Sequence, residues 1–472
     1  MIADPMTRVS DETTLQTQRR GDLNPAPLLR QLLLLALPVL AENMLHMVVG
    51  INDTYLANKL KIVADRAPAG AAVGTITYFL WFFGLLVSSV GAGTTAIIAR
   101  ARGARHRSMA NSVTGQSMSA AVLIGIVVGV VIYLMAVPIM SVTGLQGAAP
   151  AFALPYLRML AVTLPFTMAM QIAGSCQRGY GDTLTAAVVM IAVDIVNIFF
   201  SWGLCRGWWG MPEMGFNGIA LGTIIAYVFG GVAQFIALLH GRNGLRLFWH
   251  RMRPHWTTIK RLLRIGVPAG AEGILMWLAN FGVMRVVNSI DPTNAMPNAH
   301  MNAIRIESLS FMTGLAFAAA AATMVGQSLG MKDVRRAVRS ALLAYAVGGG
   351  AMTLCGLFFI FFGRYPAALL SPDAHIAALT TRCLFITGFI QCGFAAYIIF
   401  SGALRGAGDT FVVMLVSLIS VVALRFVGVM IVGAWLHKGL TSIWIVLASE
   451  LFIRGVLVSL RFWQGGWKHL KV

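Results

Sequence analysis

The sequence predicts an all-α integral membrane protein with twelve transmembrane helices, arranged as two pseudo-symmetric six-helix bundles around a central cleft. Three observations predict this fold. Apolar residues make up 58% of the chain and charged residues only 11%, whereas soluble domains carry about 25% charged residues. Uncharged runs of about twenty residues recur along the chain, and a helix of that length spans a bilayer. Several short motifs occur twice in the same order, which indicates an internal duplication.

The spans are expected to be helices, because a helix satisfies its own backbone hydrogen bonds inside lipid and the short alternating segments of a β-barrel are absent from the sequence. Breaks at charged or Gly/Pro-rich positions separate the spans. Their expected limits are 28–52, 70–99, 109–137, 151–176, 184–205, 214–240, 262–287, 298–327, 335–362, 375–402, 411–433 and 440–462. The five cysteines are scattered without metal-site spacing and are expected to be small buried residues.

An even number of spans places both termini on one side of the membrane. Lys and Arg are about four times as frequent in the loops on that side as in the others, which predicts cytoplasmic termini in a cell inner membrane. We expect a disordered cytoplasmic tail over 1–27, an N-terminal lobe over 28–240, a basic linker over 241–261, a C-terminal lobe over 262–463 and a cytoplasmic tail over 464–472. Residues 1–27 show no signal-peptide pattern.

The net charge of +19 is explained by basic loops that face anionic lipid. The most basic stretch, GRNGLRLFWHRMRPHWTTIKRLLRIG (241–266), interleaves Trp and Arg, which leaves RNA contact as an alternative. We favour an amphipathic linker on the inner membrane face, with membrane lipid as its partner and no nucleic acid.

The duplication rests on motifs that occur once in each half. The pairs are LPVLAENML (37–45) with VPAGAEGIL (267–275), GARHRSMAN (103–111) with GMKDVRRAV (330–338), and RGYGDT (178–183) with RGAGDT (405–410). Because each half has six spans, both halves cross the membrane in the same sense and the repeat is parallel. Two such bundles facing each other would leave a cleft open to one side at a time.

The paired loops carry the same residue types. These are Arg178 and Arg405, Gly181 and Gly408, and Asp182 and Asp409. The glycines permit tight turns, the aspartates can cap the helices that follow, and the arginines favour the cytoplasmic edge. We interpret the loops as structural, with a contact in a cytoplasmic gate as the alternative.

Several motifs together resemble one known family. RGYGDT followed by VVMIAVDIVNIFF, with RGAGDT in the second half, resembles the paired loops of multidrug and toxic compound extrusion (MATE) transporters of the MOP flippase superfamily. GINDTYLAN (50–58) and IRIESLSFMTGLAFAAAAATMVGQSLGMKD (304–333) also resemble this family. The resemblance spans residues 28–462. It implies a twelve-helix, two-lobed, cation-coupled exporter with cytoplasmic termini, and it leaves the exported compound open.

Acidic residues inside the predicted spans are the candidate functional groups, because a carboxylate in the bilayer core is costly. They are Glu42, Asp53, Asp194, Glu272, Glu307 and Glu450. Glu42 and Asp53 are eleven residues apart, which places them on one stripe of the first helix. Asp194, Asn197 and Ser201 follow i, i+3, i+7 spacing on the fifth. If these two faces converge, their oxygens could hold a proton or Na⁺, without any other cofactor or metal.

The resemblance implies roles at matching positions. Asp53 matches the family aspartate of the first helix that is implicated in cation coupling, and Asn197 matches an asparagine of the family's N-terminal cation site. Several members carry an aspartate where this chain has Ser201, and Asp194, one turn earlier, is the candidate to compensate. Thr223 in GIALGT matches a threonine of the same site. The coupling ion, H⁺ or Na⁺, stays open, with Ser201 favouring H⁺ slightly.

The same acids have structural interpretations. Asp53 lies near the predicted end of its helix, where it could sit among lipid headgroups. Asp194 and Asn197 could form a buried hydrogen bond between helices instead of an ion site.

Glu42 and Glu272 each follow a proline by four residues. They could bind freed backbone groups, bind the partner lobe, or take part in coupling or substrate binding. Pro38 removes a helical hydrogen bond, and we expect it to be a gating hinge that responds to cation occupancy at Asp53. In some relatives a coupling carboxylate lies one turn beyond Glu272, where this chain has Met276.

Other charged and aromatic residues in the second half are also candidates. We expect Arg305 and Glu307 to pair with other helices, with Arg285 or Arg425 as partners, and to be possible coupling or substrate residues otherwise. Glu450 and Arg454 have the i, i+4 spacing of an intrahelical ion pair. Met276 and Trp277 could contact planar, lipophilic cations, although such side chains more often face lipid.

Taken together, these features predict a monomeric secondary-active antiporter that exports amphiphilic, cationic drugs or metabolites in exchange for H⁺ or Na⁺. A flippase for lipid-linked precursors, from the same superfamily, is the alternative, and it would require a cationic cleft for phosphate headgroups. An enzyme is not expected, because no HExxH motif or Ser/His/Asp arrangement is present. A channel is disfavoured, because a duplication with acids in mid-membrane suits alternating access better.

Overall fold

A computed structural model of the chain describes residues 25–143, 145, 147–241, 244–253, 255–291 and 295–470. Within these ranges, twelve helical spans are long and apolar enough to cross a membrane, and the predicted all-α fold is confirmed. The first helix begins at Pro25, so the expected tail over 1–27 ends slightly earlier, and the rest of it lies outside the described residues.

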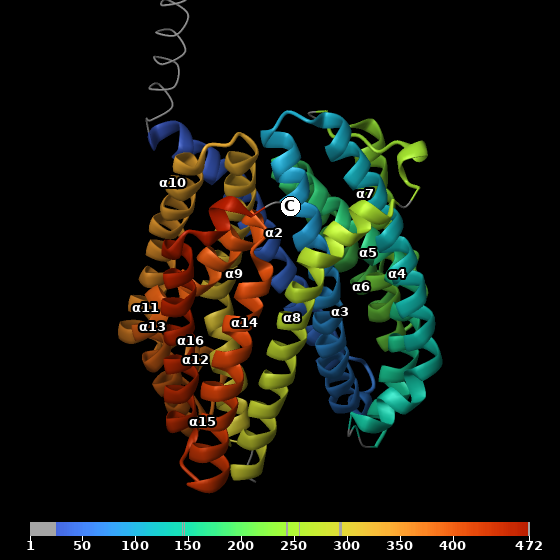
Figure 1. Cartoon of the computed structure of the whole chain (residues 1–472). Coiled ribbons are helices and arrows are strands. Elements are labelled where there is room, and N and C mark those ends of the chain that lie inside the picture. The colour runs from blue at the N-terminus through green and yellow to red at the C-terminus, as the bar shows by residue number, and fades with distance from the viewer. Residues whose placement is uncertain are drawn as a thin grey trace, which may run out of the picture.

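The first six spans form one bundle, coloured blue to green in Figure 1. They are α2 (Pro25–Asn58), α3 (Val63–Gly103), α4 (Arg107–Val142), α5 (Ala149–Tyr180), α6 (Thr183–Arg206) and α7 (Phe216–His240). Within the bundle, α4 packs on α5, α6 packs on α7, and α2 lies against α6. A short 3₁₀ turn, Trp208–Gly210, follows α6.

The last six spans form the second bundle, around a central helix α13 that packs on α9, α11 and α16. Its elements are α8 (Trp256–Ile290), α9 (Ala295–Gly330), α10 (Val334–Ala344), α11 (Gly350–Phe362), α12 (Arg364–Leu370), α13 (Ala374–Ala407), α14 (Thr410–Ser420), α15 (Val427–Val429) and α16 (Leu440–Gln464). The ninth span is α10 and α11 joined by a π-helical turn, Tyr345–Gly349. The eleventh joins α14 and α15 through the π-helical turn Val421–Phe426 and continues into another, Met430–Trp435.

The first helix of each half packs partly against the opposite bundle. Leu28 and Leu32 of α2 are buried in one cluster with residues of α9, α10 and α13. Leu262 and Ile265 of α8 are buried in a cluster with residues of α3, α4 and α5. The predicted lobe boundaries therefore divide the sequence but do not divide the packing at these two helices.

The two bundles meet at one end, which is uppermost in Figure 1 and which also holds the end of the chain. We call it the arginine-rich end, and we define it by the connections 104–106, 181–182, 331–333 and 408–409. The ends of α3 and α9 cross there without room for side chains. A Cβ on Gly103 would clash with the Gln327 carbonyl, and one on Gly330 would clash with the Arg100 carbonyl. Glycine is required because the two helix backbones touch.

The segments before α8 and after α16 are packed at the same end. In the linker, Leu247 is buried and its N–H donates to the Leu238 carbonyl, while Ser119 of α4 donates to the Met252 carbonyl. The 3₁₀ turn Trp249–Arg251 lies within this linker. In the turn Gly466–His469, Trp467 is fully buried and stacks on Phe462 with ring centroids 5.1 Å apart. The expected terminal tail is therefore largely folded into the second bundle.

Candidate functional site

The duplicated motifs bind each other in both halves of the molecule. Arg178, at the end of α5, places Nη1 3.3 Å from Oε1 of Glu42 on α2. Arg405, at the end of α13, places Nη2 2.7 Å from Oε2 of Glu272 on α8. The arginine of each repeated loop thus pairs with the glutamate of the first helix in its own half, and this assigns the glutamates a partner that sequence reasoning did not find.

The turns of the repeated loops need glycine. Gly181 and Gly408 have φ values of 93° and 87°, in the left-handed region that glycine occupies without strain. The expected cap is present at Asp182, whose side chain accepts from Thr185 N at 3.3 Å. The prediction that Asp409 caps the helix that follows it is wrong. Its side chain caps no helix and instead accepts from Nε of Arg461 on α16 at 2.9 Å.

The first loop also compensates for the proline in α2. Pro38 has no N–H, so the carbonyl of Leu34, four residues earlier, loses its helical donor. Thr183 Oγ1 donates to that carbonyl at 3.1 Å. The N-terminal part of α2 is thereby attached to the start of α6, and the backbone group that Pro38 frees is satisfied.

Each repeated loop also accepts hydrogen bonds from the opposite bundle. From α3, Arg100 Nη2 donates to the Ala407 carbonyl at 2.8 Å. From α9, Thr323 Oγ1 donates to the Arg178 carbonyl at 3.0 Å, and Gln327 Nε2 is 3.4 Å from the Gly179 carbonyl. The loops are therefore both structural turns and contact surfaces where the bundles meet.

The predicted polar face of α6 is buried within the first bundle. Asp194, Asn197 and Ser201 all lie below 4% exposure. Asn197 Nδ2 donates to Thr223 Oγ1 of α7 at 3.1 Å, and Tyr156 of α5 lies 3.1 Å from the same hydroxyl. Three helices thus bring these groups together, and Thr223 joins the set as expected.

Three oxygens on this face are buried without a hydrogen-bond partner in the described part of the chain. They are Asp194 Oδ2, Asn197 Oδ1 and Ser201 Oγ. A buried polar atom without a partner is costly, and carboxylate, amide and hydroxyl oxygens are the ligands that hard cations prefer. The residues present therefore suit a proton or a Na⁺ ion. Nowhere in the described ranges do three or more His, Cys, Asp or Glu side chains form a metal-binding group.

Asp53 lies at the opposite end of the same stripe of α2 from Glu42 and is buried, with 9% exposure. Asn52 Nδ2 lies 3.4 Å from its Oδ1, and Asn52 Oδ1 accepts from Trp202 Nε1 of α6 at 2.7 Å. Among the described residues Asp53 forms no ion pair. This burial argues against the alternative that Asp53 sits among the lipid headgroups.

Sequence reasoning missed His46. Its Nδ1 is 3.4 Å from Asp194 Oδ1, and the histidine side chain keeps 57% of its surface exposed. It lies four residues after Glu42 and seven before Asp53, so the spacing that identified the acidic stripe also includes it. His46 therefore connects the polar stripe of α2 with the polar face of α6.

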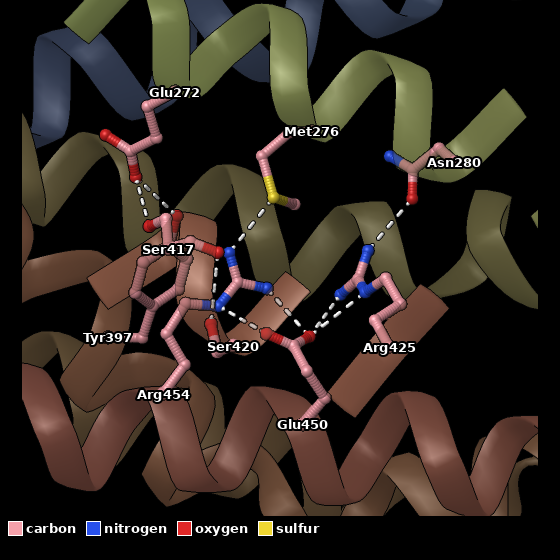
Figure 2. A network of polar contacts seen from close by, with 9 residues as sticks. All are labelled: Glu272, Met276, Asn280, Tyr397, Ser417, Ser420, Arg425, Glu450 and Arg454. Carbon is pink, nitrogen blue, oxygen red and sulfur yellow. Dashed lines mark hydrogen bonds and ion pairs between the residues drawn. The ribbon is translucent and has the colours of Figure 1, made fainter. Parts of the chain in front are cut away.

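The second bundle holds a separate polar network around its carboxylates (Figure 2). Glu272 also accepts from Tyr397 at 3.0 Å and from Ser417 at 2.7 Å. Glu450 is paired with Arg454 at 2.8 Å, which confirms the predicted intrahelical pair, and with Arg425 at 2.7 Å. Unlike Asp53, both of these acids are neutralised by arginine.

The predicted pairing of Glu307 with an arginine is wrong in the described structure. Arg425 is bound to Glu450 and to Asn280 Oδ1, and Glu307 Oε1 is buried without a hydrogen-bond partner. Arg305, on the same helix, has an exposed side chain. Both were proposed as partners of other helices, and neither forms an ion pair within the described residues.

Met276 and Trp277 of α8 lie on two different surfaces. Met276 Sδ contacts Arg454 Nη1 at 3.0 Å and so faces the network of Figure 2. Trp277 meets Phe82 of α3 with ring centroids 5.4 Å apart, across the boundary between the bundles. Its Nε1 is buried without a partner among the described residues.

Comparison with protein families decides the identity of this fold. The MatE family model matches twice, over residues 38–202 and again over residues 268–431. The chain is a MATE-family transporter. The two matches correspond to the two halves of the duplication, and they confirm the resemblance on which the sequence reading relied.

MATE-family relatives align along nearly the whole chain. "Probable multidrug resistance protein NorM" of Thermotoga maritima is 27% identical over 442 residues, 93% of each chain. "Multidrug resistance protein PmpM" of Pseudomonas aeruginosa is 25% identical over 392 residues, covering 83% of this chain and 81% of the relative.

The solved structures of this fold are more distant in sequence. A MOP superfamily transporter from Pyrococcus furiosus matches with a TM-score of 0.86 and 18% identity, over 94% of this chain and 97% of the other. The outward-facing conformation of a multidrug resistance MATE family transporter matches with the same score, identity and coverage. This likeness establishes the fold of a multi-pass membrane protein.

Proposed function

We propose that this transporter exports amphiphilic, cationic small molecules in exchange for inward H⁺ or Na⁺. It works as a monomer in the cell inner membrane, without a cofactor, and both termini and the arginine-rich end face the cytoplasm. The relatives named as multidrug resistance proteins support the assignment of efflux. The excess of Lys and Arg in the loops at that end supports the orientation.

One observation carries the proposal, namely that Asp53 and Asp194, unlike Glu42, Glu272 and Glu450, have no arginine partner among the described residues. Glu307 on α9 shares this feature but lies outside the polar face of α6. Glu272 and Glu450 in the second bundle are each bound by arginine. Asp53 and Asp194 in the first have no arginine partner within the described residues, and Asp194 contacts only His46 as an ionic partner. Carboxylates without a fixed counter-charge can exchange one cation for another, whereas arginine-bound carboxylates are already neutralised.

Exchange of the coupling ion for the substrate follows if both bind at the same negatively charged site. A proton or Na⁺ at Asp194, Asn197, Ser201 and Thr223 would neutralise the charge that attracts an organic cation. Binding of the ion and of the substrate would then oppose each other, a coupling that is reciprocal by thermodynamic necessity. Asp53 and Pro38 lie on the same helix, so the charge at Asp53 would bias the bend of α2 around Pro38.

The flippase alternative is less well supported. A phosphate headgroup needs basic groups that are free to bind it, and the buried arginines of the second bundle are occupied. Arg425 is held by Glu450 and Asn280, and Arg454 is held by Glu450. The drug exporter therefore remains the conclusion.

The test is substrate-driven ion flux in proteoliposomes. Tetraphenylphosphonium serves as the lipophilic cation, and pH and Na⁺ gradients are imposed separately on the wild type, on Asp53→Asn and on Asp65→Asn. The last variant makes the same chemical change in the first turn of α3. We expect one gradient to drive uptake into inside-out vesicles, Asp53→Asn to abolish that dependence, and Asp65→Asn to preserve it. Wild-type transport that ignores both gradients would overturn the proposal.

A further inference from the structure

Two buried glutamines in the first bundle carry polar atoms that bind nothing in the described part of the chain. Gln234 of α7 is fully buried, and neither its Nε2 nor its Oε1 has a hydrogen-bond partner. Gln177, near the end of α5, is 3% exposed, and its Oε1 also lacks a partner. A buried amide atom without a partner destabilises a fold. Packing alone would therefore favour an apolar side chain at both positions.

The second bundle has apolar residues at the equivalent positions. The repeated loops align Gln177 with Leu404, because each residue directly precedes the arginine of its loop. The helices α7 and α16 both have 25 residues and align Gln234 with Val458. Leu404 and Val458 are fully buried in the core of the second bundle. The duplicated fold thus accommodates apolar side chains here, and its packing does not explain glutamines in the bundle that holds Asp194.

Both glutamines lie between the polar face of α6 and the arginine-rich end. Along α7, Thr223 binds Asn197, and Gln234 follows eleven residues later, which is about 16 Å farther toward that end. Along α5, Gln177 directly precedes Arg178, whose loop belongs to the arginine-rich end. Two helices therefore place polar groups at successive depths between the proposed ion site and this end.

A layer of methionine side chains lies between the polar face of α6 and Gln234. Met170 of α5 and Met190 of α6 are buried in one cluster. A Cβ on Gly230 of α7, one turn before Gln234, would clash with Met170 Sδ. Methionine is unbranched and has three rotatable bonds. The layer is closed in this structure, and rotation of these side chains can open it without a change in the backbone.

We propose that Gln234 and Gln177 line the route by which the coupling ion leaves the first bundle toward the arginine-rich end. An amide oxygen accepts from water or contacts a hard cation, and an amide N–H donates to water. A hydrated path along the two glutamines carries H⁺ or Na⁺, and the methionine layer separates this path from the ion site until the ion is released. This inference rests on the proposed exchange of substrate for an ion.

The test compares two modes of transport by Gln234→Leu in proteoliposomes. Uptake of tetraphenylphosphonium driven by an ion gradient requires release of the ion. Exchange of labelled for unlabelled tetraphenylphosphonium at equal concentrations, without an ion gradient, does not require it. An apolar side chain on the route should lower ion-driven uptake about tenfold and leave exchange within about twofold of the wild type. Gln177→Leu should show the same selective loss.

Gln391→Leu is the matched control. It removes a fully buried glutamine with an unpartnered Nε2 from α13 of the second bundle, and both modes should keep their wild-type rates. The inference is overturned if Gln234→Leu retains ion-driven uptake at the wild-type rate, or if both of its transport modes fall together. Wild-type uptake that ignores both ion gradients would instead refute the proposed exchange itself.

Thermal unfolding gives a second readout that separates a route from a structural role. Because the Gln234 amide has no hydrogen-bond partner among the described residues, Gln234→Leu should have a Tm equal to or above that of the wild type. A glutamine that holds the fold together through a buried water would behave differently. A fall in Tm of several degrees without a selective loss of ion-driven uptake would overturn the inference.

Discussion

Arg405 and Glu272 form an ion pair that repeats, between α13 and α8, the pair of Arg178 and Glu42 between α5 and α2. The repeated loop therefore has the same structural role in both halves. Its arginine fixes the first helix of each half, and its backbone carbonyls receive side chains from the opposite bundle.

The two copies of this pair should differ in strength. Glu272 accepts from Arg405, Tyr397 and Ser417, whereas the only described partner of Glu42 is Arg178, at a longer distance. Breaking a buried pair leaves an uncompensated charge, so Glu272→Gln should lower the free energy of unfolding by about 3 kcal/mol. Glu42→Gln should lower it by about 1 kcal/mol. Thermal unfolding in detergent measures both, and a larger loss for Glu42→Gln would contradict the assignment.

Ser201→Ala should weaken ion binding while leaving the free energy of unfolding nearly unchanged. Its Oγ has no hydrogen-bond partner among the described residues, so its removal should change the free energy of unfolding by less than about 0.5 kcal/mol. The loss of one oxygen ligand, worth about 1.4 kcal/mol, should weaken binding of the coupling ion about tenfold. Ser340→Ala removes a similarly buried, unpartnered hydroxyl from α10 and should leave ion binding unchanged. If both variants bind the ion like the wild type, Ser201 is not a ligand.

Pro38→Ala should stiffen α2. Alanine restores an N–H that can donate to the Leu34 carbonyl, in competition with Thr183. A shift of about 1.4 kcal/mol in favour of a straight helix would slow transport about tenfold. Pro268→Ala makes the equivalent change in α8 and should have a smaller effect, because no unpaired acid follows it on that helix. Initial transport rates and their dependence on the coupling ion test this prediction. If Pro38→Ala matches the wild type in transport rate and in ion dependence, Pro38 is not a gating hinge.

Gly330→Ala should open the arginine-rich end. Its Cβ would overlap the Arg100 carbonyl, and neither backbone can move without separating α3 from α9. We expect a loss of about 1 to 3 kcal/mol of stability and greater reactivity of a cysteine placed at Gln327 toward a water-soluble maleimide. Gly350→Ala, where a Cβ meets nothing within 4 Å, is the matched helix control. Unchanged reactivity in Gly330→Ala would argue against tight closure at this point.

The features that follow from local spacing were predictable from the sequence. Span lengths are set by bilayer thickness, the i, i+4 pair of Glu450 and Arg454 lies on one helix, and the face of Asp194, Asn197 and Ser201 follows from helical periodicity. These predictions depend on one element at a time. The common face of α6 was accordingly found buried as a unit.

The features that depend on two elements were not predictable in this way. Spacing cannot say that Arg425 lies beside Glu450 rather than Glu307, or that Asp409 faces Arg461 instead of its own helix. His46 is a different case, because its position on the acidic stripe of α2 could have been read from the sequence. It was missed because only acids were sought on that stripe.

The hydrogen bond from Arg100 to the Leu470 carbonyl, 2.7 Å long, joins residues 370 positions apart. During synthesis, α3 leaves the ribosome long before its acceptor exists, and Arg100 cannot form this bond until the ten later spans have been inserted. Stable closure of this end is therefore an event of late biogenesis. A ribosome stalled within α16 would hold a nearly complete transporter that still lacks this one hydrogen bond between its halves.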